Sequence, residues 1–353
     1  YILTYDNNGG NGCNSQTGIK DGQWGTLCTP TKTGHTFLRW QDENENTITS
    51  TLTVSNNLTA YAVWQANTYT ISFDANGGSG GQSTNVIATY GQAMPEISTT
   101  GPSRTGYTFI GWYDNTNYAA SGAKQYYTAS GVSARSFDRT SPTPFPLYAG
   151  WQGNQFNISY NGNENTGGST ASHNCTYGQS CSLSSNGFSK TGYTFAGWKK
   201  NNTGSTMSAG SSIANISTGD PVTFYAQWSA NTYTLTLNPN GGSYSGTTGN
   251  TNKTMTYGTK NNNSIGTASK SSYVFLGWYT AASGGSQVFD ASGQNVNNST
   301  YWTAAYSNGT WKYTGNVTLY AHWANRTTET YSNPGNYSYT VPQTGTYKLE
   351  AWG

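Results

Sequence analysis

Charged residues are scarce in this chain. Asp, Glu, Lys and Arg make up 8% of its 353 residues and leave a formal net charge of +2, whereas an average soluble protein holds about 25% charged residues. The basic residues form no cluster, so the chain lacks the electrostatic footprint of a protein that binds nucleic acid or an acidic membrane surface. Long apolar runs are lacking as well. No stretch reaches the roughly 18 apolar residues of a membrane span, and we expect no membrane insertion in this segment.

Titratable groups are too few for a catalytic centre. Enzymes gather acids, histidines and nucleophiles in one cleft, but this chain has 14 acidic residues and 3 histidines in all. His35, His173 and His322 are far apart in the sequence, which disfavours a zinc site with its full set of ligands. No Asp-rich loop suits calcium, and no glycine-rich loop lies where a strand meets a helix to hold phosphate. We therefore expect a protein that is not an enzyme and that needs no cofactor or metal.

Cysteines number only four, and they fall into two neighbouring pairs. An even number of cysteines, paired within short segments, is typical of secreted proteins with disulfide bonds. We predict the disulfides Cys13–Cys28 and Cys175–Cys181. These bonds require an oxidising compartment, so we expect the chain outside the cell or at the cell surface.

Aromatic residues, by contrast, are abundant at 14%, which argues against disorder, and many of them recur in register. The sequence TGYTFIGW (105–112) returns as TGHTFLRW (33–40), TGYTFAGW (191–198) and SSYVFLGW (271–278). A second aromatic signature follows each copy and ends at Trp64, Trp151, Trp228 or Trp323. Landmarks repeated in a fixed order indicate tandem copies of one small unit. We predict repeats at 1–66, 67–153, 154–229 and 230–324, followed at 325–353 by a linker and a β-hairpin that begins a further domain or serves as an assembly strand.

Each copy opens with the alternation of a half-buried strand. In the second copy Tyr69, Ile71 and Phe73 face one way, which predicts a strand with one face in the core. The strand runs into Asn76-Gly77, and Asn-Gly accepts the positive φ angles of a tight turn. We therefore predict a mainly β chain.

The aromatic signature has an irregular spacing. Phe109 and Trp112 would face opposite sides of a regular strand, so we predict a β-bulge at Gly111 that returns Trp112 to the core side. Small units need large apolar side chains in their cores. We therefore predict that the tryptophans of both signatures form the structural core: Trp40, Trp64, Trp112, Trp151, Trp198, Trp228, Trp278 and Trp323.

A long polar loop at 295–316 carries further aromatic residues, namely Tyr301, Trp302, Tyr306, Trp311 and Tyr313. Two interpretations are open. The loop folds back over its own hydrophobic side chains, or these aromatics, surrounded by Asn, Ser and Thr, form a contact surface for a protein or a glycan.

The segments YTISFDANGG, TYGQ, SRTGYTFIGWYD and PLYAGW of the second copy resemble the Listeria–Bacteroides repeat, also called the internalin B-repeat. The resemblance covers about residues 1–324. It implies tandem small β-grasp-like (ubiquitin-like) units on secreted and wall-attached bacterial surface proteins, with roles in spacing, adhesion and partner contact and no catalytic residues. The short linkers between copies predict an elongated rod. The segment 337–353 resembles the opening hairpin of glycine-rich surface-protein domains.

These features lead to one principal hypothesis. The chain is a non-enzymatic, extracellular bacterial surface protein whose four repeats act as a semi-rigid stalk or adhesin segment for spacing and for contact with a cell surface or a partner. One alternative is a structural subunit of an extracellular filament that assembles by strand exchange. The other is a glycan-binding module. The expected partners are a protein or glycan at a cell surface, or copies of the chain itself, and no nucleic acid.

Overall fold

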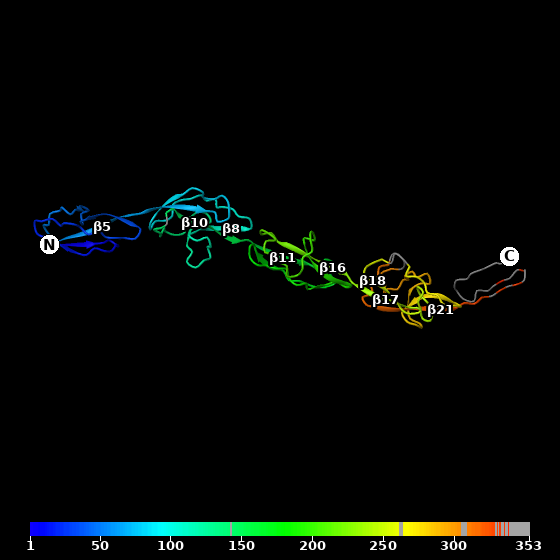
Figure 1. Cartoon of the computed structure of the whole chain (residues 1–353). Helices are drawn as coiled ribbons and strands as arrows, with labels where there is room; N and C mark the ends of the chain where they lie inside the picture. The colour runs from blue at the N-terminus through cyan, green and yellow to red at the C-terminus, as the bar shows by residue number, and fades with distance from the viewer. Residues whose placement is uncertain are drawn as a thin grey trace. The chain divides into compact units, whose positions relative to one another are not determined.

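The computed structural model describes residues 1–141, 143–260, 264–304 and 309–328, together with 330, 332, 335 and 338. Throughout these residues the regular elements are strands, with no helix among them (Figure 1). Accordingly, the described part of the chain has no helix long and apolar enough to cross a membrane. The hairpin expected at 337–353 lies outside the described residues, apart from residue 338.

The chain divides into two compact units, and the division runs through the third repeat. The first unit comprises Tyr1–Asn161, Thr170–Ser185 and Trp198–Tyr225, and the second comprises Gly162–Ser169, Asn186–Gly197 and Ala226–Gly353. The mainly β prediction is confirmed in both.

The first repeat forms a five-stranded sheet in the order β2-β1-β5-β3-β4. Its first and last strands are parallel neighbours, and the other pairs are antiparallel. The strands are β1 (Ile2–Asp6), β2 (Gln16–Thr17), β3 (His35–Gln41), β4 (Thr47–Ile48) and β5 (Leu58–Ala66).

The second and fourth repeats repeat this arrangement, in the orders β7-β6-β10-β8-β9 and β18-β17-β21-β19-β20. In the second repeat the strands are β6 (Thr68–Asp74), β7 (Val86–Thr89), β8 (Tyr107–Tyr113), β9 (Gln125–Thr128) and β10 (Phe145–Gly153). In the fourth they are β17 (Thr232–Asn238), β18 (Thr251–Thr256), β19 (Tyr273–Tyr279), β20 (Gln287–Phe289) and β21 (Val317–Asn325).

The third repeat has a four-stranded sheet in the order β13-β11-β16-β15 and a separate two-stranded sheet, β12-β14. The strands are β11 (Gln155–Asn161), β12 (Gly167–Gly168), β13 (His173–Thr176), β14 (Phe188–Ser189), β15 (Tyr193–Lys200) and β16 (Val222–Ala230). The small extra sheet follows from a longer turn after β11, where Asn163 and Glu164 both have positive φ.

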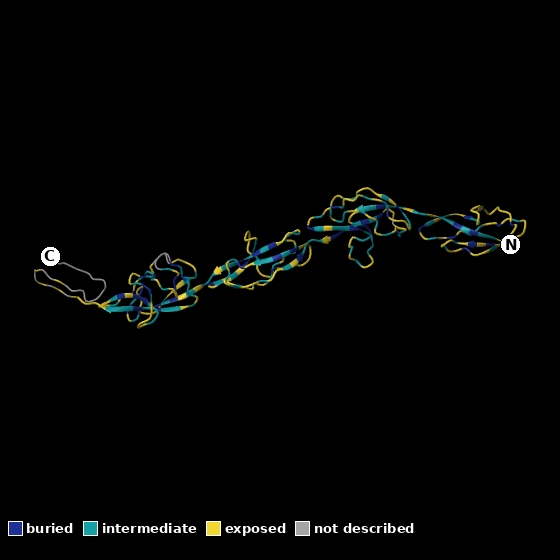
Figure 2. Cartoon of the chain, turned by 180° about the vertical axis from the view of Figure 1, so that it is seen from behind, coloured by how far each residue is buried: buried dark blue, intermediate teal, exposed yellow. Residues whose placement is uncertain are grey.

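Large aromatic side chains are buried in the core of each repeat, and Figure 2 shows buried residues along the strands of each repeat. The four tryptophans of the first signature are fully buried: Trp40, Trp112, Trp198 and Trp278. Of the closing tryptophans, Trp151 is buried, whereas Trp64, Trp228 and Trp323 are half-buried. All four closing tryptophans donate their indole N–H to a backbone carbonyl in the turn after the repeat's first strand.

The predicted β-bulge is present in the aromatic signature. In the second repeat Phe109 pairs with Trp151 and Gly111 pairs with Gly150, so Ile110 is an extra residue in β8. The same shift occurs in the first and fourth repeats. It brings Phe109 and Trp112 into one core, with their ring centroids 5.4 Å apart.

Candidate functional site: the junctions between repeats

A single asparagine lies at the centre of each connection between repeats. Asn67, Asn154 and Asn231 are each the third residue after a closing tryptophan. The backbone N–H of each asparagine donates to the carbonyl of the glycine in the Thr-Gly pair of the preceding repeat. These bonds are Asn67 to Gly34, Asn154 to Gly106 and Asn231 to Gly192, all 2.9 Å long.

Two further hydrogen bonds fix each asparagine. Its side-chain oxygen accepts from the threonine hydroxyl of the preceding signature, and its carbonyl accepts from the N–H of a tyrosine in the following repeat. At the second junction Thr108 donates to Asn154 at 2.7 Å, and the N–H of Tyr177 donates to the Asn154 carbonyl at 2.8 Å. The first junction uses Thr36, Asn67 and Tyr90, and the third uses Thr194, Asn231 and Tyr257. The asparagine therefore links one repeat to the next.

An aromatic pair, with one ring from each of the two repeats, packs beside each junction. Tyr107 packs edge-on against Tyr177 with ring centroids 5.3 Å apart, and Tyr193 packs in the same way against Tyr257 at 5.4 Å. At the first junction His35 replaces the first tyrosine and lies 5.6 Å from Tyr90. Edge-on pairs of this kind contribute about 0.5–1.5 kcal/mol beyond their buried area.

Glycines allow the two repeats to approach closely. A Cβ on Gly106 would lie 2.5 Å from the Tyr177 ring, and one on Gly178 would overlap the Tyr107 hydroxyl. Gly106 also has φ +78°, where a side chain is strained. The Thr-Gly pair in the signature and the Tyr-Gly pair of the next repeat are thus complementary parts of one contact.

A basic residue supports each junction from its own repeat. It stands two positions before the glycine and is Lys32, Arg104 or Lys190; in the fourth repeat Lys270 occupies the same place before Ser272. The three junction residues each donate to a carbonyl in the turn after the repeat's first strand. Arg104 also lies 4.3 Å from the centroid of Tyr107, so this ring is held between a cation of its own repeat and the tyrosine of the next.

The fourth repeat retains only part of this arrangement. Ser272 replaces the glycine and has φ +65°, and its carbonyl accepts a hydrogen bond from the Arg326 N–H at 2.9 Å. The Nζ atom of Lys270 lies 4.4 Å from the centroid of the Tyr273 ring, but this tyrosine is 38% exposed.

Comparison with known proteins places these signatures in a family. Four segments match the Listeria-Bacteroides repeat domain, at residues 1–63, 69–133, 156–227 and 233–301. The chain belongs to this family. The resemblance inferred from the sequence is therefore confirmed.

The chain is also similar in sequence to curated proteins, including these three. Two come from Evansella cellulosilytica. The one provisionally named a membrane protein is 31% identical over 242 residues, or 65% of this chain. The one provisionally named a Gly-rich membrane protein is 34% identical over 250 residues, or 69% of this chain. The third, Internalin H of Listeria monocytogenes, is 34% identical over 89 residues, or 24% of this chain. The matched regions span 33%, 26% and 15% of these proteins.

The aromatic loop of the fourth repeat is not a contact surface at its tryptophans. Trp302 and Trp311 are each 1% exposed and pack against each other with ring centroids 5.2 Å apart. Tyr301 is also buried, and Tyr313 packs against the same core cluster. The contact-surface interpretation is wrong for these tryptophans, because the loop folds over its own side chains. Tyr306 lies outside the described residues.

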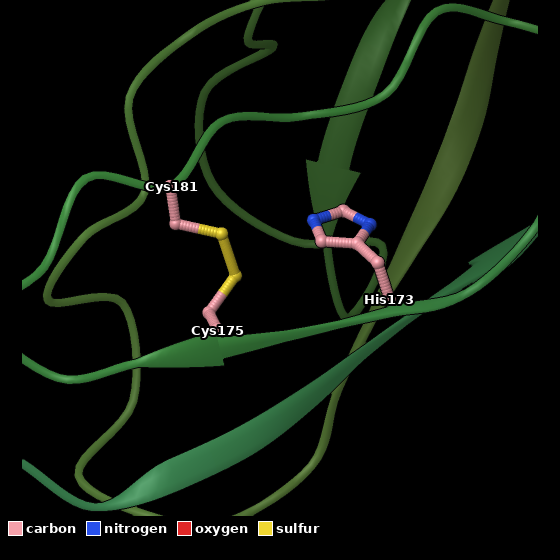
Figure 3. A group of neighbouring side chains, drawn as sticks. All are labelled: His173, Cys175 and Cys181. Carbon is pink, nitrogen blue, oxygen red and sulfur yellow. A yellow bond between two sulfur atoms is a disulfide. The ribbon is translucent and has the colours of Figure 1, made fainter.

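Both disulfides join the predicted cysteines, Cys13 to Cys28 and Cys175 to Cys181. Beside the second bond lies His173, on the same strand as Cys175 (Figure 3). The imidazole nitrogen and the two sulfur atoms lie within 4.8 Å of one another. Because the sulfur atoms are bonded to each other, neither offers a thiolate, and the group lacks the ligand set of a zinc site.

The second repeat carries a cluster of charges that the sequence reasoning did not identify. Arg139 forms an ion pair with Asp114, whose side chain is 6% exposed, and Lys124 forms another with Asp138 at 2.6 Å. Desolvation raises the pKa of the Asp138 carboxyl, but the hydrogen bonds from Lys124 and Tyr126 outweigh it and this pKa lies below its usual value. The pKa of the Tyr126 hydroxyl is raised, mainly by burial and to a smaller extent by its hydrogen bond to Asp138. These groups are paired with one another inside the insertion between β8 and β10, an arrangement that stabilises a loop.

Proposed function

We propose that this chain is a non-enzymatic segment of an extracellular bacterial surface protein, in which four β-grasp-like repeats act as a semi-rigid stalk or adhesin segment. The observation that carries the proposal is the recurrence of one set of contacts at three junctions. Linkers that only tether domains are flexible and make few contacts, whereas each of these linkers forms three hydrogen bonds and is covered by an aromatic pair.

The strength of a junction follows from these contacts. Opening it gives up three hydrogen bonds, each worth about 0.5–1.5 kcal/mol net, and one aromatic pair worth about 0.5–1.5 kcal/mol. The groups are partly exposed, so the low end of each range applies and the sum is about 2 kcal/mol. A difference of this size favours the closed junction by roughly 30 to 1. Such a joint is restrained without being fixed.

The proposed repeat bounds are 1–66, 67–153, 154–229 and 230–324. The assignment of each repeat as β-grasp-like is supported by a mixed sheet whose first and last strands are parallel neighbours. The surface location is supported by the two disulfides and by the names of the related proteins. The proposed role is spacing, together with contact to a protein or glycan at a cell surface.

Small-angle X-ray scattering of the full chain tests the semi-rigid stalk. Four units of this size in a row give a maximum dimension on the order of 120 Å. We expect wild type to fit a narrow distribution of dimensions and the triple variant Asn67→Ala, Asn154→Ala, Asn231→Ala to fit a broad one.

A matched control changes three exposed asparagines away from the junctions: Asn14→Ala, Asn85→Ala and Asn250→Ala. It should scatter like wild type. Identical profiles for the two triple variants would show that the junctions do not restrain the repeats. Sedimentation of the same samples should give a monomer at every concentration, whereas a filament subunit would polymerise.

A further inference from the structure

The first and last strands of every repeat lie side by side in the middle of its sheet and run parallel. β1 pairs with β5, β6 with β10, β11 with β16 and β17 with β21. The chain enters a repeat at the start of the first strand and leaves it beyond the end of the last. In a parallel pair these two points lie at opposite ends of the shared hydrogen-bond ladder.

We propose that each repeat resists tension along the chain, because tension loads the ladder between its first and last strands in shear. Force applied at the two ends of such a pair pulls one strand along the other. All the bonds of the ladder are then strained together. Force applied at the same end of both strands would instead separate them one bond at a time. This inference goes beyond the proposed spacing role and does not depend on it.

The side chains of the two strands oppose sliding as well. Two apolar partner pairs face the core in each ladder, and a slip by one residue would turn them to the solvent side. These pairs are Leu3–Leu58 and Tyr5–Ala60, Ile71–Phe145 and Phe73–Leu147, Ile158–Val222 and Tyr160–Phe224, and Leu235–Val317 and Leu237–Leu319.

Two side-chain ties reinforce the same strand pair in each repeat. The asparagine of the turn after the first strand donates from Nδ2 to an alanine carbonyl of the last strand. These bonds are Asn8 to Ala62, Asn76 to Ala149, Asn163 to Ala226 and Asn240 to Ala321, at 2.8–3.1 Å. In the opposite direction the closing tryptophan donates from its indole to a carbonyl in that turn, as Trp64 does to Asn7 at 2.9 Å.

Single-molecule pulling on the full chain tests the proposal through the direction of the force. Handles on Tyr1 and Gln65, both exposed, load the first repeat in shear. Handles on Tyr1 and Asn56, also exposed, lie near the starts of both strands and separate the same pair bond by bond. At one pulling speed we expect a rupture force at least about twofold higher in shear, because several bonds must break together. Equal forces in the two directions would overturn the proposal.

The disulfides identify which repeat has ruptured when the whole chain is pulled from its ends. Extended chain measures about 3.6 Å per residue. Reduction should therefore lengthen the first repeat's extension by roughly 50 Å, since the 15 residues from Cys13 to Cys28 extend to about 54 Å and the intact bond already spans 5.8 Å between the two Cα atoms. It should lengthen the third repeat's extension by roughly 15 Å, since the 6 residues from Cys175 to Cys181 extend to about 22 Å and the intact bond already spans 5.9 Å between the two Cα atoms. The extensions of the second and fourth repeats should not change.

A substitution at Asn8 tests the side-chain tie separately. Asn8 has φ +46°, a conformation that glycine adopts readily, so Asn8→Gly removes the bond to Ala62 while suiting the backbone. We expect a lower rupture force in shear and an unchanged force in the peeling direction. Asn14→Gly, at an exposed position in the same repeat, is the control and should change neither. A fall in both directions for Asn8→Gly would mean that the tie stabilises the whole repeat and has no particular part in shear.

Discussion

Substitution of Gly106 by alanine should open the junction between the second and third repeats while leaving both repeats folded. Gly106 has φ +78°, and its added Cβ would lie 2.5 Å from the Tyr177 ring. The ring therefore has to move away. Its movement removes the edge contact with Tyr107 and pulls the Tyr177 N–H from the Asn154 carbonyl.

The expected size of the effect comes from these contacts. The closed junction is favoured by about 2 kcal/mol, as estimated from its hydrogen bonds and aromatic pair. Loss of that preference corresponds to a fall of roughly 30-fold in protection against hydrogen exchange. The amides that report it are those of Asn154, which donates to Gly106, and Tyr177, which donates to Asn154. Amides within the central ladder of β6 and β10 should keep their protection.

Gly122→Ala provides the matched control. Gly122 lies in an exposed loop of the second repeat with φ +83° and has nothing within 4 Å of an added Cβ. It therefore carries the same backbone strain of about 1–2 kcal/mol without the steric conflict. Residue-resolved hydrogen exchange should show weakened junction amides only in Gly106→Ala. If Asn154 and Tyr177 exchange equally fast in the two variants, the junction is not held by this contact and the semi-rigid stalk loses its support.

Three further predictions concern stability. Trp112→Ala should melt only the second repeat and Trp311→Ala only the fourth, each at a cost of roughly 3–5 kcal/mol of stability, because the two cores are separate. Hydrogen exchange measured across all four repeats tests this, and global unfolding in either variant would contradict it. The lowered pKa of the Asp138 carboxyl stabilises the fold by less than about 1 kcal/mol at this part-exposed site; this stability is present above the unfolded pKa of about 3.9 and is lost as the pH falls through the folded pKa. In thermal melts the difference in melting temperature between wild type and Asp138→Asn should shrink at low pH, and a difference that stays constant would refute this prediction. Reduction should destabilise the first repeat by about 3 kcal/mol and the third by about 2 kcal/mol, and denaturant unfolding that affects both equally would contradict the dependence on loop length.

Local pattern was sufficient to predict the strands, the bulge and the disulfides. The alternation of Tyr69, Ile71 and Phe73 predicts which face of the strand is buried. Phe109 and Trp112 can both face one core only if the strand between them contains an extra residue, as it does. The disulfides could be predicted because each bond joins cysteines of one repeat that are 15 or 6 residues apart. In each case the physical cause lies within the same repeat as the signal.

Features that depend on distant partners were harder to predict. Trp302 and Trp311 stand among polar residues in the sequence. They are buried because they pack against each other and against other aromatic rings of the fourth repeat, among them Phe289 and Tyr301. The junction asparagines were hidden for a different reason. The chain is rich in asparagine, so no single Asn is conspicuous. An alignment of the copies on the closing tryptophan would have revealed Asn67, Asn154 and Asn231 at one position.

The weakened fourth signature shows that this motif encodes two separate tasks. Its second half builds the core, and the fourth repeat keeps it as Phe275, Gly277 and Trp278 with the same bulge. Its first half joins the next repeat, and there the fourth copy differs: Ser272 replaces the glycine and Val274 replaces the threonine that binds the linker asparagine.

The linker changes at the same time. Arg326 occupies the position of that asparagine in the fourth copy, and of the junction hydrogen bonds it keeps the backbone bond to residue 272. A threonine hydroxyl without an asparagine, or an asparagine without the hydroxyl, would leave a polar group of the junction without its intended partner. If the threonine and the asparagine act as a pair, both should be replaced together, and in the fourth copy both are replaced. It supports the conclusion that residues 34–36, 106–108 and 192–194 are constrained by the following repeat as well as by their own.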